Sequence, residues 1–254
     1  MKRSKPLSAL AIAAGLALAA LAAAGCEGTE TGNPFQVELR ADAHSSDPGA
    51  VAVGEGGAVV VTEAWLALDP IAMAPAGDCT DAEVSAADFG TADHAASGAV
   101  LEQLELDEGE YCRALLPFVH AAAPMPEGAP PELEGSSVVI IGEITASGTP
   151  FRLVSRLEQT VDVHALSALG GRFDLTADQP ALFLGFDVAR WFAPVDLASA
   201  ELDGEGVAVI DDTSNQDLLG AFETDMAAGI ELYRDLDQDG SVDPPDDQLL
   251  ARGQ

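Results

Sequence analysis

Acidic residues recur at alternate positions near the carboxyl end of the chain, in the stretch DLDQDGSVDPPD that spans residues 235–246. Counted from the first of these residues, acids fall at positions 1, 3, 5, 9 and 12, a glycine at 6 and an aliphatic residue at 8. Ca²⁺ prefers about six to eight oxygen ligands, and alternate acids on a tight loop can supply them. The sequence therefore predicts a calcium site built from Asp235, Asp237, Asp239, Ser241, Asp243 and Asp246.

This spacing is that of an EF-hand calcium loop, in which the glycine allows a sharp turn and Ser241 would offer its backbone carbonyl. Valine at position 8 with aspartate at position 12 resembles the calcium loop of dockerin modules. The loop departs from the usual EF-hand because Asp246 is shorter than the bidentate glutamate at position 12. It departs from dockerins because they carry two such loops, whereas this sequence shows one. The alternative is an acidic carboxyl-terminal tail, since a chain with 43 acids contains chance clusters.

The residues before the loop have the spacing of an amphipathic helix. Apolar side chains recur every three or four positions, at Leu218, Leu219, Phe222, Met226, Ile230 and Tyr233. Ser214 or Asn215 can cap the start of this helix. We therefore expect a helix over residues 214–236 whose apolar face packs on the rest of the domain or, alternatively, binds a partner.

Short strand-like segments separated by turns fill residues 35–212. Polar and apolar residues alternate over Phe35–Asp42, and β-prone stretches follow at 58–67, 100–106, 111–119, 136–147, 151–157, 160–166, 173–175, 181–188 and 207–210. The turns at 107–110 and 148–150 predict that their flanking strands form hairpins. This pattern is typical of an antiparallel β-sandwich, so we expect a mainly β fold with one carboxyl-terminal helix and the calcium loop.

Three segments follow one another along the chain in an order that matches a known family: Val61–Leu68 (VTEAWLAL), Leu104–Tyr111 (LELDEGEY) and Ala181–Trp191 (ALFLGFDVARW). Their order resembles a broad family of bacterial surface lipoproteins of unknown function, over roughly residues 35–200. The resemblance implies a prealbumin-like or immunoglobulin-like β-sandwich and an exported location. It brings no catalytic residues.

The amino-terminal segment has the layout of a secretory signal, with basic residues, an apolar run from Leu7 to Ala24, and small residues before Cys26. A cysteine at this point resembles the lipobox of bacterial lipoproteins, in which it is lipidated and begins the mature chain. An ordinary cleaved signal or a retained membrane anchor is the alternative. The expected organisation is a signal peptide over 1–25, a tether over 26–34, a β-sandwich over 35–212, and the helix with its calcium loop over 213–254.

The mature chain is strongly acidic. The first 25 residues hold Lys2, Arg3 and Lys5 but no acid, which leaves 8 arginines against 43 acids. Such a surface repels phosphate, so nucleic acid is excluded as a partner and only the lipid would hold the chain on a membrane. The two remaining cysteines, Cys79 and Cys112, predict a disulfide in an exported chain, with two buried free thiols as the alternative.

The sequence contains no G-x-S-x-G, H-E-x-x-H, P-loop or dinucleotide-binding motif, and its 4 histidines are scattered singly. We therefore expect a non-enzymatic, lipid-anchored protein of the cell envelope, at the outer membrane or the periplasmic face, that binds a carbohydrate or protein ligand at its surface. Two alternatives stay open. A calcium-stabilised carbohydrate-active enzyme or accessory module would need paired carboxylates in a cleft near Trp65 or Trp191, and a calcium-dependent docking protein would need exposed Phe222 or Tyr233.

Overall fold

The computed structural model of the chain describes residues 33–77, 79, 86–96, 100–179, 181–237, 242 and 246–254. The predicted signal peptide 1–25, the lipidation residue Cys26 and most of the predicted tether 26–34 lie outside these residues. Within the part that is described, no helix combines the length and the apolar character needed to cross a membrane. Residues 32–254 form one compact unit.

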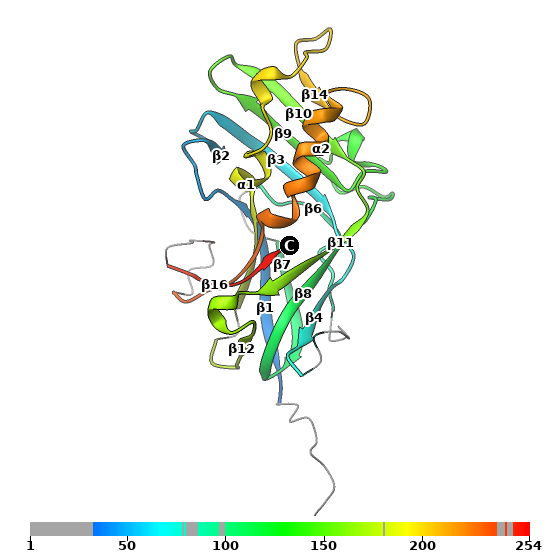
Figure 1. Ribbon diagram of the computed structural model, residues 1–254. Helices are drawn as coiled ribbons and strands as arrows, with labels where there is room; N and C mark the ends of the chain where they lie inside the picture. The colour runs from blue at the N-terminus through cyan, green and yellow to red at the C-terminus, as the bar shows by residue number, and fades with distance from the viewer. Residues whose placement is uncertain are drawn as a thin grey trace, which may run out of the picture. The chain divides into compact units, whose positions relative to one another are not determined.

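The described residues fold mainly into two β-sheets (Figure 1). The larger sheet has ten strands, in the order β5 (Ala86–Ala87), β4 (Ile71–Pro75), β8 (Gly109–Phe118), β11 (Gln159–Ala165), β16 (Gln248–Gly253), β15 (Ile230–Arg234), β13 (Ala181–Asp187), β1 (Pro34–His44) and β7 (Val100–Asp107), with β12 (Phe173–Leu175) paired to β8. The smaller sheet has six, in the order β14 (Ala208–Ile210), β10 (Thr149–Ser155), β9 (Val138–Ile144), β3 (Val59–Ala67) and β2 (Val51–Val53), with β6 (Thr91–Asp93) paired to β3.

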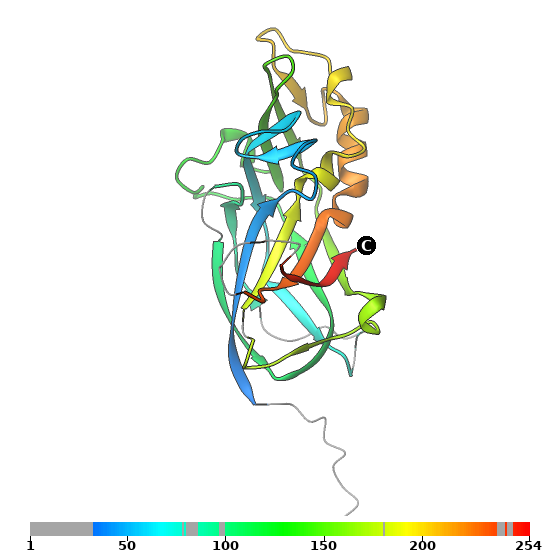
Figure 2. The same ribbon diagram turned by 90° about the vertical axis from the view of Figure 1, so that its left-hand side faces the viewer.

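Helices are short and few in the described part of the chain. They are α1 (Val188–Phe192), α2 (Gln216–Asp225) and the 3₁₀ turns η1 (Pro131–Leu133), η2 (Ser167–Leu169), η3 (Leu197–Ser199) and η4 (Ala227–Gly229). Figure 2 shows α1 and α2 lying together along one side of the smaller sheet. Their buried residues Trp191 and Phe222 join the main hydrophobic core together with the inward side chains of both sheets.

The strand predictions hold well where polar and apolar residues alternate. In β1 the apolar residues Val37, Leu39 and Ala41 are buried, and the polar residues between them are only partly buried. This alternation is what a strand with one face on the core requires. The predicted hairpin around residues 148–150 also forms, because β9 and β10 pair antiparallel.

Two pairing predictions are wrong. The segments at 100–106 and 111–119 are strands, but they form no hairpin: β7 pairs with β1, whereas β8 pairs with β4, β11 and β12. The sheets are also mixed rather than antiparallel, since β1 runs parallel to β13, β10 to β14 and β2 to β3. Strands β1 and β13 are distant in the chain, so no turn between neighbours sets their relative direction.

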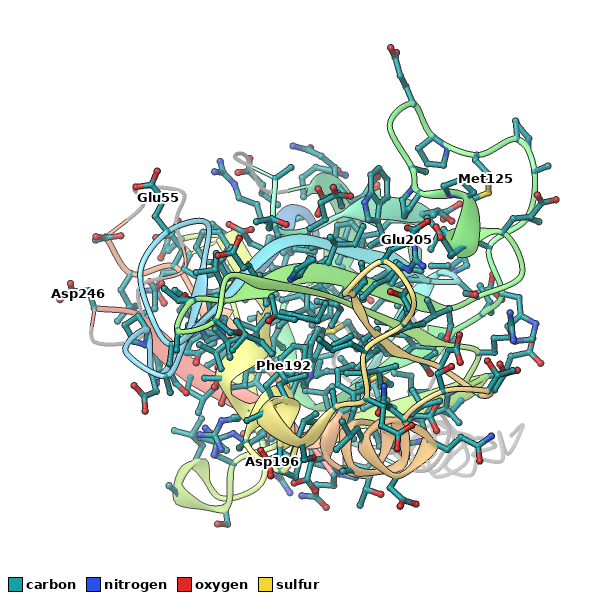
Figure 3. All side chains as sticks on the ribbon, turned by 90° about the horizontal axis from the view of Figure 1, so that it is seen from above. Glu55, Met125, Phe192, Asp196, Glu205 and Asp246 are labelled. Atoms are coloured by element: carbon teal, nitrogen blue, oxygen red, sulfur yellow. A yellow bond between two sulfur atoms is a disulfide. The ribbon has the colours of Figure 1, made fainter. Side chains whose placement is uncertain are left out.

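A second, smaller core lies beneath the proline-rich loop, which spans residues 121–135 and precedes β9. Trp65, Val139 and Val154 project from the outer face of the smaller sheet and pack beneath residues of this loop, including Leu133 and Met125. Figure 3 shows Met125 on the loop above the strands. The loop therefore shields apolar side chains that would otherwise face water.

The predicted disulfide is confirmed. Cys79 is bonded to Cys112, with 6.1 Å between their Cα atoms and a sequence separation of 33. Cys112 lies on β8, so the bond ties the segment after β4 to the strand that pairs with β4. Closing a loop of this length restricts the unfolded chain and stabilises the fold by about 3–4 kcal/mol in the loop-entropy model.

Candidate metal centre

The predicted calcium loop connects two neighbouring strands, β15 and β16, rather than two helices. Both strands lie inside the larger sheet, between β13 and β11. The predicted boundary at residues 212–213 therefore does not separate two bodies, because the segment after it completes the sheet. The helix predicted over 214–236 is right only in its first half: α2 ends at Asp225, and Ile230–Arg234 is strand β15.

After α2 ends at Asp225, the chain passes close to α1 at Gly229. A Cβ atom on Gly229 would lie 2.4 Å from the Trp191 ring and 3.0 Å from the Asp187 carbonyl oxygen, so the chain passes too close to α1 for a side chain here. Ile230 and the residues after it then pair with β13 over five positions. Sheet pairing thus overrides the three-and-four spacing that predicts a longer helix.

Three carboxylates meet at the loop end of this hairpin. One oxygen each of Asp235, Asp237 and Asp247 lies within 4.8 Å of the other two. Asp235 and Asp247 are buried, at 5% and 8% exposed, and Asp237 is exposed. Asp247 Oδ1 also accepts a hydrogen bond from the Leu236 backbone N–H at 3.2 Å. Partly buried carboxylates at this spacing repel one another, and a hard divalent cation with a preference for oxygen relieves that repulsion.

The predicted ligands fall into three groups. Asp235 and Asp237 belong to the cluster. Asp239, Ser241 and Asp243 lie outside the described residues. Asp246 is exposed and projects at the periphery (Figure 3), and the described cluster contains its neighbour Asp247 instead. The hairpin register explains the difference, because Tyr233 pairs with Leu249 and Arg234 with Gln248, so the next facing positions are 235 and 247.

A second polar cluster, which the sequence did not predict, is centred on Glu231 of β15. Glu231 is 1% exposed. Arg252 Nε donates to its Oε1 at 2.7 Å, and the Tyr233 hydroxyl donates to its Oε2. His44 Nε2 lies 3.5 Å from Oε2, and Arg190 Nε lies 3.5 Å from Oε1. We call these five residues the Glu231 network; it joins β1, α1, β15 and β16.

Burial alone would raise the pKa of Glu231, but its contacts with His44 and Tyr233 and the charge of Arg252 outweigh burial and lower this pKa to about 2. Burial and the neighbouring carboxylate of Glu231 raise the pKa of Tyr233, so its hydroxyl stays protonated and remains a donor. The Glu231 network therefore joins four elements through hydrogen bonds from Arg252 and Tyr233 and the longer contacts of His44 and Arg190.

Two other groups titrate with opposite effects on stability. Burial lowers the pKa of His94 from 6.5 to about 4, so the unfolded chain binds a proton first and the free energy of unfolding falls as the pH falls. Burial raises the pKa of Asp42 from 3.8 to about 6, so the folded chain binds a proton first and the free energy of unfolding rises as the pH falls. Between about pH 6 and pH 4 these two slopes oppose each other.

We therefore expect Asp42→Asn to make the protein sensitive to mild acid. With Asp42 removed, the His94 slope is no longer offset, and the free energy of unfolding should fall by up to about 1.4 kcal/mol per pH unit between pH 6 and pH 5. Urea unfolding at a series of pH values measures this slope. The exposed Asp178→Asn is the matched control, and an Asp42→Asn slope equal to that of the control contradicts the assignment.

The described residues give little support to a sugar-binding cleft. Trp191 is 0% and Trp65 is 7% exposed, so neither ring offers a face to a ligand. A polar hollow of about 440 Å³ lies instead at the start of α2, lined by residues that include Glu201, Asn215 and Asp217. Phe222 and Tyr233 are also buried, which removes the apolar helix face that the docking alternative needs.

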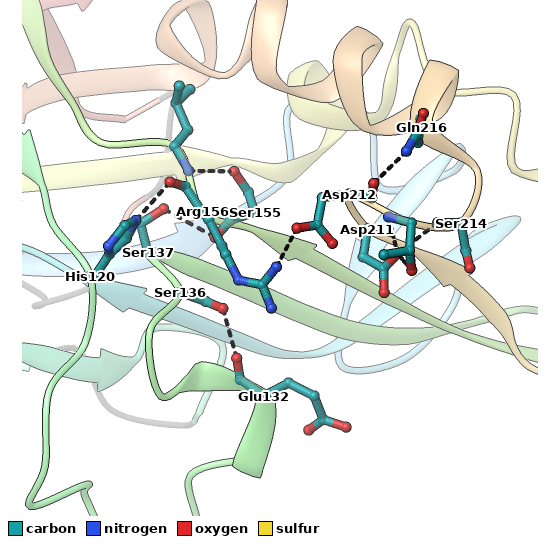
Figure 4. Close-up of polar contacts among 12 residues, drawn as sticks. His120, Glu132, Ser136, Ser137, Ser155, Arg156, Asp211, Asp212, Ser214 and Gln216 are labelled. Carbon is teal, nitrogen blue, oxygen red and sulfur yellow. Dashed lines mark hydrogen bonds and ion pairs between the residues drawn. The ribbon is translucent and has the colours of Figure 1, made fainter.

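Serine hydroxyls near α2 hold elements together. Ser155 Oγ donates to Glu223 Oε1 at 2.6 Å, which ties β10 to α2, and Ser137 Oγ donates to the Ser155 carbonyl at 3.2 Å. Figure 4 shows His120 with its Nε2 paired to the Arg156 carbonyl, at 2.8 Å. The serine–carboxylate and histidine–carbonyl contacts are thus separate hydrogen bonds.

Fold and site together define a mainly β protein with a carboxylate cluster at the end of one interior hairpin. No protein-family model and no curated protein matches the chain. Among solved structures, MbnP from Methylosinus trichosporium is similar over 86% of this chain and 99% of that chain, at 14% sequence identity and a TM-score of 0.39. It is a distant structural neighbour, and a likeness at this level carries no information on ligand or activity.

Proposed function

We propose that the chain is a lipid-anchored, non-enzymatic binding module of the cell envelope, stabilised by one calcium ion. Its body would be a β-sandwich of the prealbumin-like or immunoglobulin-like type, and its ligand a carbohydrate or a protein. The amino-terminal pattern that ends at Cys26 supports export and lipidation. The meeting of Asp235, Asp237 and Asp247 within 4.8 Å is the observation that carries the calcium part of the proposal.

The proposed ligand set takes its side chains from both strands of the hairpin. Asp235 and Asp237 follow β15, and Asp247 precedes β16. Asp239, Ser241 and Asp243, which the sequence predicts as ligands together with Asp246, would complete the proposed set. Ca²⁺ prefers six to eight oxygens at about 2.3–2.6 Å. Mg²⁺ requires shorter, near-octahedral bonds and keeps its water, so a loop this rich in carboxylates should favour calcium.

Calcium is expected to raise the melting temperature of residues 27–254. Binding only to the folded state stabilises by about 2.7 kcal/mol at a hundredfold excess over Kd. For a chain of this size, that corresponds to about 5–10 °C. Titration calorimetry should show one site with a clear preference for calcium over magnesium, and differential scanning calorimetry should show the shift.

Two neighbouring variants make this test specific. Asp247→Asn should abolish both the heat of binding and the thermal shift, and Asp246→Asn should keep most of each, because Asp246 is exposed and outside the described cluster. Asp237→Asn should behave like Asp247→Asn. A parent protein without heat of binding, or an Asp237→Asn variant that responds like the parent, would refute the calcium proposal.

A further inference from the structure

Strand β1 is the first strand of the described chain, and it lies inside the larger sheet. It runs between β13, its parallel partner over seven positions, and β7, its antiparallel partner over eight. From β1 the chain goes directly to β2 of the smaller sheet (Figures 1 and 2). A force that pulls on residues before Pro34 therefore enters the fold at β1 and draws this strand along its own axis, away from the smaller sheet.

The buried side of β1 is held by close packing. Val37, Leu39 and Ala41 are at most 1% exposed, and Val37 faces the buried Leu104 of β7. Side chains alternate along a strand with a period of two, so a slip by one residue would turn each of these side chains away from the core. Movement of β1 along its axis is therefore opposed by packing as well as by hydrogen bonds.

His94, which directly follows β6, joins the far end of β1 to the smaller sheet. Its carbonyl accepts a hydrogen bond from the Ala43 N–H at 2.7 Å, and its own N–H donates to the Ala64 carbonyl of β3 at 2.9 Å. Its Nδ1 lies 3.2 Å from the Ala41 carbonyl oxygen, and the residue is 1% exposed. Force on β1 thus reaches the smaller sheet through these contacts as well as through the chain between β1 and β2.

We infer that β1 is a mechanical clamp: it receives a pulling force on the membrane anchor and resists this force in shear. The inference rests on the proposed lipid anchor at Cys26 and adds a load-bearing role to it. A force along β1 stretches the hydrogen bonds to β13 and β7 together, so many bonds must break at once. A force that parts two strands from one end breaks them one after another. The clamp would keep the module folded while a bound ligand is pulled away from the membrane.

Single-molecule pulling in two directions tests this inference. Both experiments hold the unlipidated mature chain by the thiol of Cys26, the cysteine outside the Cys79–Cys112 disulfide. A second handle at the exposed Ala146, in the turn between β9 and β10, loads β1 along its axis. This turn lies at the end of the smaller sheet away from the larger one, because the other end of β3 leads into the bridge between Leu68 and Phe118.

The comparison handle is placed at the exposed Asp178, shortly before β13. It pulls the parallel strands β1 and β13 apart from their shared amino-terminal end. At one constant force, the folded chain should survive about tenfold longer or more with the handle at Ala146, since forced unfolding follows the unfolding rate. Equal lifetimes, or a longer lifetime with the handle at Asp178, overturn the clamp. Reducing the disulfide should lengthen the unfolded chain by 33 residues, about 115 Å, which identifies a single unfolding molecule.

Two core leucines give matched variants for the same measurement. Leu39 of β1 is 1% exposed and Leu116 of β8 is 0% exposed, so their substitution by alanine should cost similar free energies of unfolding at equilibrium. With the handle at Ala146, Leu39→Ala should clearly shorten the lifetime, and Leu116→Ala should shorten it less. Equal shortening by the two variants would show that β1 is not the element that resists the force.

Lipid labelling of Cys26 in cells separates the clamp from the anchoring on which it rests. Labelled protein with equal lifetimes in the two pulling directions keeps the proposed anchoring and rejects the clamp. Absence of the label rejects the anchoring and, with it, the load-bearing role of β1.

Discussion

Glu231→Ala is expected to lower the free energy of unfolding by about 3–5 kcal/mol, the usual loss when one partner of a buried ion cluster is removed. The substitution leaves the guanidinium group of Arg252 and the hydroxyl of Tyr233 without their shared acceptor. It also removes the longer ion pair with Arg190, which keeps its contact with Asp187 at 3.0 Å. Tyr233 is 3% exposed, so water reaches this hydroxyl poorly. Urea unfolding near pH 7, in saturating calcium, measures the loss separately from any effect on the ion.

A matched exposed pair gives the control for this prediction. Glu110 binds Arg172 with both side chains about half exposed, so Glu110→Gln should cost less than about 1 kcal/mol. The pKa of Glu231, lowered to about 2, adds a second readout. The ionised Glu231 carboxylate stabilises the fold fully above the unfolded pKa of 4.5, and this stabilisation is lost as the pH falls from there toward 2. Glu231→Gln should therefore make the free energy of unfolding less dependent on pH in this range. Equal losses for Glu231→Ala and Glu110→Gln would contradict the role of the network.

Strands could be predicted from the sequence because burial on one face leaves a period of two. Alternation in β1 and the run of apolar residues in β13 each correspond to an observed strand. Strand partners could not be predicted in the same way. The acidic turn at 107–110 indicates a hairpin locally, yet β7 finds more favourable partners in β1, where Val37 faces Leu104 and Phe35 faces Leu106 on the core side.

The helix prediction failed for a related reason. Met226, Ile230 and Tyr233 have helical spacing, but Ile230 and Leu232 also alternate with Glu231 and Tyr233. The helical and the strand period both fit a segment this short. Pairing with β13 therefore determines that residues 230–234 form a strand. Tyr233 looks like part of an apolar helix face, whereas it lies on the polar side of β15 and donates to Glu231.

The meeting of Asp235 and Asp237 was predictable from the sequence, but their third partner, Asp247, was not. Alternating aspartates indicate a cation site in any backbone context that brings them together. The choice between Asp246 and Asp247 depends on strand register, which an EF-hand numbering cannot supply because it assumes two flanking helices. Nothing in the sequence indicated the Glu231 network, since its members come from four separate elements.

Trp191→Ala is expected to destabilise the protein by about 3–5 kcal/mol, as for other large aromatic side chains deleted from a core. Trp191 is fully buried, and its ring centroid lies 5.7 Å from that of Phe186 and 5.8 Å from that of Phe222. It therefore joins β13, α1 and α2 at one point. In a chain of this size the loss corresponds to a fall in melting temperature of about 10–15 °C, which scanning calorimetry would measure.

Comparing Trp191→Phe with Trp65→Phe tests how much a buried indole hydrogen bond contributes to stability beyond the packing of the ring. Trp191 Nε1–H donates to the Met226 carbonyl at 2.8 Å, where α2 ends, so its loss leaves a buried acceptor unpaired at a cost of about 1–3 kcal/mol. Trp65 Nε1–H donates to Glu63 Oε2 at 2.8 Å, and that carboxylate is only partly buried and can bind water instead. Trp65→Phe should therefore cost clearly less than Trp191→Phe. The opposite order would mean that the smaller core beneath the proline-rich loop, and not the junction of α1 with α2, dominates the stability of this fold.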